Sequence, residues 1–161
     1  MAKGDMFLKL DGIKGESMDD KHKDEIEISS LSWGASQSGS GGSMGGSGVG
    51  KVNLADIHIT KTVDKASTSL FQKCCQGTHI TKGTITIRRS GEKPQDYETI
   101  DLTEVFISSW SQSAADGSGL PTESVSLNFS KIEFDYKAQK ADGTLDASTK
   151  KGWDVKVNKI T

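Results

Sequence analysis

The chain has 161 residues, of which 20 are Lys or Arg and 22 are Asp or Glu. This length fits a single domain, 1–161, that can bury about 70% of the surface its unfolded chain exposes. The near balance of charge argues against a general binder of nucleic acid or of anionic membranes. No apolar run approaches the roughly 20 residues of a membrane span, and the start MAKGDMFLKLDG lacks the apolar core of a cleaved signal peptide. We therefore expect synthesis and folding in the cytosol, without insertion into a membrane.

Two strand-like segments open the chain. MFLKLDGIKGES (6–17) alternates in polarity and then breaks at Asp11-Gly12, a strong turn pair. DEIEISSLSW (24–33) alternates two glutamates with two isoleucines. Ser30 and Ser32 follow at the same even-numbered positions as those isoleucines, so they fall on the same face of the strand beyond the last apolar residue. Hydroxyl side chains at such positions fit a solvated outer face or the wall of a water-filled lumen equally well.

A Gly/Ser-rich run follows. Of the fifteen residues 36–50, seven are Gly and five are Ser. This composition behaves as a flexible coil. A structureless stretch of this length is uncommon inside a compact domain, and is usually functional or disordered. We predict a long flexible loop over residues 36–50.

The end of this run is one residue short of a phosphate-binding loop. Gly45 is followed by four residues and then by Gly50-Lys51, but Val52 stands where the Mg²⁺-binding hydroxyl is needed. Such a loop must also leave a buried strand and enter a helix. Here Ser and Gly precede it and a β-branched, strand-like segment follows. The sequence therefore predicts no nucleotide site and no cofactor.

The remaining chain predicts further strands and one helix. DKASTSLFQKCCQG (64–77) places Ala66, Leu70 and Cys74 on one helical face, which predicts a helix at about 66–76. Ser67 or Ser69 could cap its start, and Gly77 fits the position after its end. Further strand-like runs bring the total to about seven, at 51–63, 83–91, 96–110, 123–139 and 152–160.

One strand-like run changes parity midway. Val125, Leu127 and Phe129 occupy odd positions, whereas Ile132 and Phe134 occupy even ones. A change of parity indicates a bulge or a corner, where the chain leaves one sheet and joins another. Many short strands with turns between them indicate an all-β sandwich or barrel.

No catalytic or metal-binding constellation stands out. The sequence contains no G-x-S-x-G elbow and no carboxylate pair at a spacing that indicates a glycosidase. Cys74 and Cys75 are adjacent, which matches neither a redox motif nor a zinc site. The histidines are widely spaced. We therefore predict no catalytic and no metal-ligating residues, and a protein that is not an enzyme.

Several segments of the chain, in their order along it, resemble the Hcp (haemolysin-coregulated protein) family. Hcp proteins are the inner-tube subunits of bacterial type VI secretion systems and are similar to contractile phage tail-tube proteins. The resemblance runs nearly end to end. It rests on DMFLKLDGIKGES (5–17), LSWGASQSGS (31–40), GKVNLADIHITKTVDKAS (50–67), VSLNFSKIEFDYKAQKADG (125–143) and GW (152–153).

The resemblance implies a mainly β fold: a β-barrel of two antiparallel sheets with one short flanking helix and a long Gly/Ser-rich loop. It implies a homohexameric ring with a wide pore, and rings stacked into a tube that a contracting sheath expels with the spike protein VgrG. The subunit itself would be secreted without a cleaved signal peptide. The alternative is a secreted carrier or chaperone that binds effector proteins inside the pore.

Two sets of site residues are expected. Ser30 and Ser32 are candidates for lining the pore. In Hcp-like proteins the loop after the second strand reaches from one ring toward its neighbour, so the resemblance assigns ring stacking to this run. The candidates for ring stacking are Gln37, Ser38, Ser40, Ser43, Met44, Ser47 and Val49.

Overall fold

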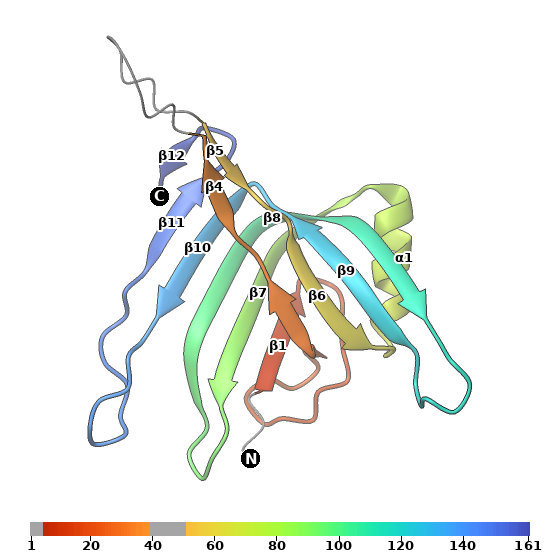
Figure 1. The fold of residues 1–161 in the computed structure, drawn as a ribbon, viewed down its shortest axis with the longest axis horizontal. Coiled ribbons are helices and arrows are strands. Elements are labelled where there is room, and N and C mark those ends of the chain that lie inside the picture. The colour runs from red at the N-terminus through yellow and green to blue at the C-terminus, as the bar shows by residue number, and fades with distance from the viewer. Residues whose placement is uncertain (1–4, 39–50) are drawn as a thin grey trace.

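The computed structural model describes residues 5–38 and 51–161 (Figure 1). It is mainly β, as predicted, with one α-helix. The elements in chain order are β1 (Asp5–Leu10), β2 (Ile26–Glu27), β3 (Ser30–Ser32), β4 (Ala35–Gln37), β5 (Val52–Leu54), β6 (Ile57–Thr62), α1 (Ser67–Gln76), β7 (His79–Arg89), β8 (Gln95–Ser113), β9 (Thr122–Asn128), β10 (Lys131–Tyr136), β11 (Lys151–Asp154) and β12 (Lys159–Ile160).

The long strand β8 is shared by two branches of one antiparallel sheet. Its first half pairs with β10 and β7, in the order β12-β11-β10-β8-β7-β1-β2. Its second half pairs with β9, in the order β8-β9-β6-β3. Glu104 lies at the junction with a positive φ of 52°. The two branches diverge at this bend (Figure 1).

The predicted corner explains the parity change. β9 ends at Asn128 and β10 begins at Lys131, and the two strands pair with different halves of β8. Ser130 donates its backbone N–H to Thr103 O between them. The apolar residues at odd positions of β9 and those at even positions of β10 therefore face the same core from two different strands.

The predicted barrel is only loosely realised, because no continuous ladder closes the sheet in the described chain. β2 and β3 lie on one segment that changes partner midway. Ile28 N–H donates to Met6 O at 3.1 Å, and Ser29 N–H donates to Thr60 O at 2.7 Å. These single hydrogen bonds bring the two branches together across one core, since β2 pairs with β1 and β3 pairs with β6.

The core fills the space between the branches. It is almost wholly aliphatic, and its members point inward from alternate positions of each strand. Its fully buried members are Leu8, Ile26, Ile57, Ala66, Leu70, Ile85, Ile100, Val105 and Leu127.

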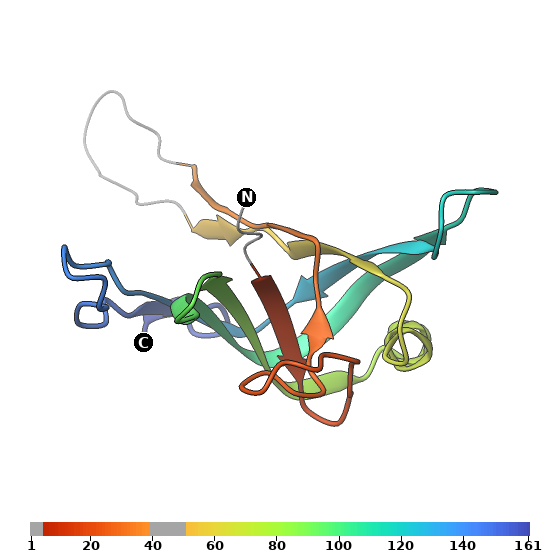
Figure 2. The ribbon, with the colours of Figure 1, turned by 90° about the horizontal axis from the view of Figure 1, so that it is seen from below.

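Helix α1 lies beside the second half of β8 (Figure 2). Just before the helix, Asp64 Oδ1 accepts the Ala66 N–H at 2.9 Å. The prediction that a serine caps the helix is wrong, because the Ser67 hydroxyl turns toward buried polar groups instead. Gly77 follows the helix in the left-handed conformation (φ 64°) and donates its N–H to Lys73 O.

Several predicted strands are divided or extended. The segments 24–33, 51–63, 123–139 and 152–160 each carry two strands. The predicted loop starts too early, because Ser36 and Gln37 belong to β4, which pairs with β5. Among the described residues, no helix combines the length and apolarity that crossing a membrane requires.

Candidate functional site

A hydroxyl-rich face covers the outer side of the second branch. The register aligns Ser30 with Thr60 and Ser124, and aligns Ser32 with His58. Side chains two residues apart share a face of a strand, so both predicted serines point to this side. The members of this face, hereafter the hydroxyl face, are Ser30, Ser32, His58, Thr60, Thr62, Ser109, Ser111, Ser113, Thr122, Ser124 and Ser126.

Hydrogen bonds tie neighbouring strands of the hydroxyl face together. The Ser30 and Thr60 hydroxyls lie 2.6 Å apart, and His58 Nδ1 lies 2.7 Å from Ser126 Oγ. Ser30 and Ser32 are both exposed. These residues include no Asp, Glu, Lys or Arg and offer hydrogen-bond donors and acceptors. One carboxylate lies beside them, since Asp56 accepts hydrogen bonds from Ser108 at 2.7 Å and from Asn128 at 2.8 Å.

A buried ionic network supports this branch from its inner side. Lys61 is fully buried, and its Nζ donates to Glu123 Oε1 at 2.8 Å and to Asp64 Oδ1 at 2.9 Å. Ser67 Oγ donates to the same Glu123 oxygen, and Gln112 Nε2 donates to the other. Burial raises the pKa of Glu123, but the hydrogen bonds from Lys61, Ser67 and Gln112 outweigh it and leave the pKa lowered.

Sequence reasoning missed this network. Lys61 and Glu123 each alternate with hydroxyl residues in their strands, which is typical of a solvated face. Only the β6–β9 register, which places Lys61 opposite Glu123, brings the two charges together.

A second polar cluster fastens the β1–β2 connection. Arg88 Nη2 donates to Asp19 Oδ2 at 2.7 Å and to Asp5 Oδ2 at 3.0 Å. The hydrogen bond from Arg88 lowers the pKa of Asp19 to about 2. His22 stacks on Phe7, and its Nδ1 lies 2.8 Å from Glu25 Oε2.

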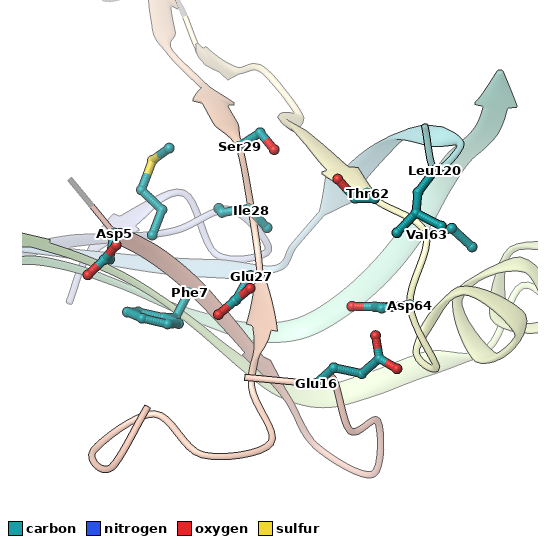
Figure 3. A pocket seen from close by; sticks show the side chains of 11 residues that line it. Asp5, Phe7, Glu16, Glu27, Ile28, Ser29, Thr62, Val63, Asp64 and Leu120 are labelled. Atoms are coloured by element: carbon teal, nitrogen blue, oxygen red, sulfur yellow. The ribbon is translucent and has the colours of Figure 1, made fainter. Parts of the chain in front are cut away.

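An acidic pocket of about 520 Å³ opens between β1 and β2 of the first branch and the end of β6 in the second. Figure 3 shows its lining, which comes from β1, the β1–β2 connection, β2 and the two residues after it, the end of β6 and the segment after it, and the β8–β9 connection. Asp5, Glu16, Glu27 and Asp64 line it together with Leu120, and no basic residue does. Glu16 and Glu27 form no ion pair with any described residue.

Most of the predicted stacking candidates are not placed. Gln37 and Ser38 are exposed at the end of β4, whereas Ser40, Ser43, Met44, Ser47 and Val49 lie outside the described residues. Val52, at the end of the incomplete phosphate-loop motif, begins β5. No group of three or more His, Cys, Asp or Glu within residues 5–38 and 51–161 is arranged to hold a metal ion.

Comparisons with known proteins agree with this architecture. The family model described as "Type VI secretion system effector, Hcp" matches residues 7–136. The chain is 44% identical to the protein Hcp1 of Pseudomonas aeruginosa, over 96% of each chain.

Solved structures match as well. Hcp1 from Salmonella typhimurium has a TM-score of 0.81 at 33% identity, with all of both chains covered. A type VI secretion system effector from Yersinia pestis has a TM-score of 0.76 at 30% identity and covers 94% of this chain and 100% of its own. The resemblance read from the sequence is therefore confirmed: this chain belongs to the Hcp family of type VI secretion system proteins.

Proposed function

We propose that six copies of this chain form a ring whose pore is lined by the hydroxyl face, and that stacked rings form the inner tube of a type VI secretion system. The observation that carries the pore assignment is the hydroxyl face itself. It spans four strands, most of its side chains are exposed, and none of them is Asp, Glu, Lys or Arg. Ser30 and Ser32 lie at its edge on β3.

An uncharged polar wall suits a conduit for varied cargo. Small hydroxyl groups keep water at the wall and form hydrogen bonds with many partners. A ring of fixed charges would instead favour one sign of cargo and repel the other. The proposed partners are other copies of the chain, the spike protein VgrG, the contractile sheath and effector proteins, with no nucleic acid among them and no insertion into the membrane.

The secretion route belongs to the same proposal. The chain would be made in the bacterial cytoplasm and would leave through the machine that it builds, without a cleaved signal peptide. It would act as a structural component, not as an enzyme.

A carrier role is the second candidate. The hydroxyl face could hold effectors by hydrogen bonds inside single rings, and tube building would then be secondary. Co-purification of effectors with unstacked rings would favour this role, whereas failure of sheath assembly in a deletion strain would favour the tube.

The experiment that tests the proposal is the solution mass of the purified protein, measured by light scattering and paired with negative-stain imaging. We expect ring-shaped particles of six times 17.2 kDa. Monomers at every concentration up to the millimolar range would contradict the ring.

A further inference from the structure

His58 is the one member of the hydroxyl face that can change its charge near neutral pH. Histidine side chains commonly gain or lose a proton between pH 5 and pH 8, whereas the hydroxyls of Ser and Thr stay neutral throughout that range. His58 lies on β6, which runs between β3 and β9 (Figure 1). Its side chain is exposed, so its ring can exchange protons with the solvent.

The hydrogen bond at one ring nitrogen can form in both charge states. His58 Nδ1 lies 2.7 Å from Ser126 Oγ. A hydroxyl both donates and accepts, so Ser126 can donate to the neutral ring and can accept from the protonated one. No carboxylate of the described residues forms an ion pair with this ring. Proton uptake therefore adds a positive charge to the face without breaking the contact that holds His58.

The strands on either side of His58 present hydroxyl groups to it. β3 places Ser32 opposite His58, and β9 places Ser126 opposite it on the other side. The charged residues of β6 and β9, Lys61 and Glu123, are buried on the inner side of the branch and pair with each other. A charge on His58 thus stands among neutral groups of the neighbouring strands.

Asp56 is a charged group beside His58 on its own segment of chain. It lies two residues before His58, just ahead of β6. Its carboxylate accepts hydrogen bonds from Ser108 on β8 and from Asn128 on β9. This part of the face therefore carries a carboxylate alone when His58 is neutral, and a carboxylate together with a cation when His58 is protonated.

We propose that proton uptake by His58 makes the pore wall bind acidic cargo more tightly, so that this residue sets how cargo retention depends on pH. The inference rests on the proposed function, in which the hydroxyl face lines the pore of a ring of six subunits. Each ring would gain up to six positive charges around one pore, and clustered charges of one sign concentrate ligands of the other. Weak contacts from several subunits add up when they act on one ligand.

Binding of rhodamine-labelled polyaspartate to the purified ring, followed by fluorescence anisotropy, tests the proposal. In 50 mM salt we expect binding about tenfold tighter at pH 5.5 than at pH 8, because several exposed ion pairs form at once. The difference should shrink in 500 mM salt, which screens exposed charges. Labelled polylysine, as the probe of opposite charge, should not gain affinity at the lower pH.

Variants of two histidines assign the effect to one residue. His58→Gln keeps a hydrogen-bonding side chain that takes up no proton, so its affinity for polyaspartate should be equal at both pH values. His58→Arg is always charged and should bind at pH 8 as tightly as the wild type does at pH 5.5. His79→Gln is the matched control, because His79 is also exposed but begins β7, outside the hydroxyl face, and its loss should keep the wild-type response. Light scattering checks that each variant remains a ring.

Two results would overturn the inference. One is a wild-type ring that binds polyaspartate equally at both pH values, and the other is an unchanged pH response in His58→Gln. Ser32→Arg separates such a failure from a failure of the proposed function. Tighter binding of polyaspartate by Ser32→Arg at pH 8 would keep the hydroxyl face as the pore wall and remove only His58. If neither variant changed the binding, or if the wild type formed no ring, the proposed function itself would be contradicted.

Discussion

At the scale of single residues, the fold changes the environment of Lys61 and Glu123 most. Both side chains are fully buried, where an unpaired charge is very costly. Their direct contact and the donors around Glu123 offset that cost. A buried pair of this kind is weak evidence for net stability, but the loss of one partner leaves the other charge uncompensated.

Lys61→Met should therefore destabilise the monomer fold by about 3–5 kcal/mol, because Glu123 remains buried without its cation. Urea unfolding followed by tryptophan fluorescence measures the change. The double variant Lys61→Met with Glu123→Gln removes both charges and should recover a large part of the loss. A double variant less stable than the single one would contradict this account.

Asp19 predicts a dependence of stability on pH. Its pKa is lowered from 3.8 to about 2 by Arg88, so the folded state favours the ionised carboxylate. That contribution is complete above pH 3.8 and is lost as the pH falls through 2. The difference in melting temperature between the wild type and Asp19→Asn should therefore be constant from pH 7 to pH 5 and shrink below pH 4.

The control for this experiment is Asp20→Asn. Asp20 is exposed and forms no ion pair with the described residues, so its replacement should leave the fall of melting temperature below pH 4 unchanged. An equal effect of the two substitutions would refute the role of Arg88.

At the scale of elements, β8 joins the two branches, and sequence reasoning anticipated this only in part. The parity change between Val125 and Ile132 predicted a corner, because alternation reports which face of a strand is buried. The predicted strand over 96–110 runs through Glu104, as β8 does, but the sequence did not predict the bend at this residue, since a non-glycine residue with positive φ leaves no mark in a polarity pattern.

The candidate site, too, could be predicted from the sequence only in part. Ser30 and Ser32 could be proposed because their parity is local information. The rest of the hydroxyl face depends on how β3, β6, β9 and β8 align, and register between distant strands is not encoded in one strand alone. His58 looked like an isolated histidine in the sequence, yet it lies between Ser32 and Ser126.

The Gly/Ser-rich segment is a further element with a prediction of its own. We propose that each loop contributes one weak contact between rings, which six copies multiply. Replacing residues 38–48 by a short turn should then leave the ring intact and reduce ring stacking. Crosslinking and electron microscopy of tubes would measure stacking. A variant with the same residues in permuted order is the control, and it should stack like the wild type if composition alone matters. Unchanged stacking in the shortened variant would remove the segment from this role.

At the scale of the whole molecule, the two faces of the second branch have different roles. Its inner side packs on the core and on the Lys61 network, while its outer side exposes hydroxyl groups. No residue of the hydroxyl face is Asp, Glu, Lys or Arg, although charged residues make up 26% of the chain. Cargo held by such a wall would bind through hydrogen bonds, which salt screens far less than exposed ion pairs.

Ser32→Arg tests this reading of the pore. The substitution adds one positive charge per subunit at an exposed position, so a ring of six would gain six charges facing one another. We expect the ring to persist, since Ser32 is exposed, and cargo retention to change and become sensitive to salt. Effector co-purification at 50 and 500 mM salt gives the readout, with Ser32→Thr as the control that keeps the hydroxyl. If every tested effector were retained as in the wild type at both salt concentrations, Ser32 would not belong to the pore wall.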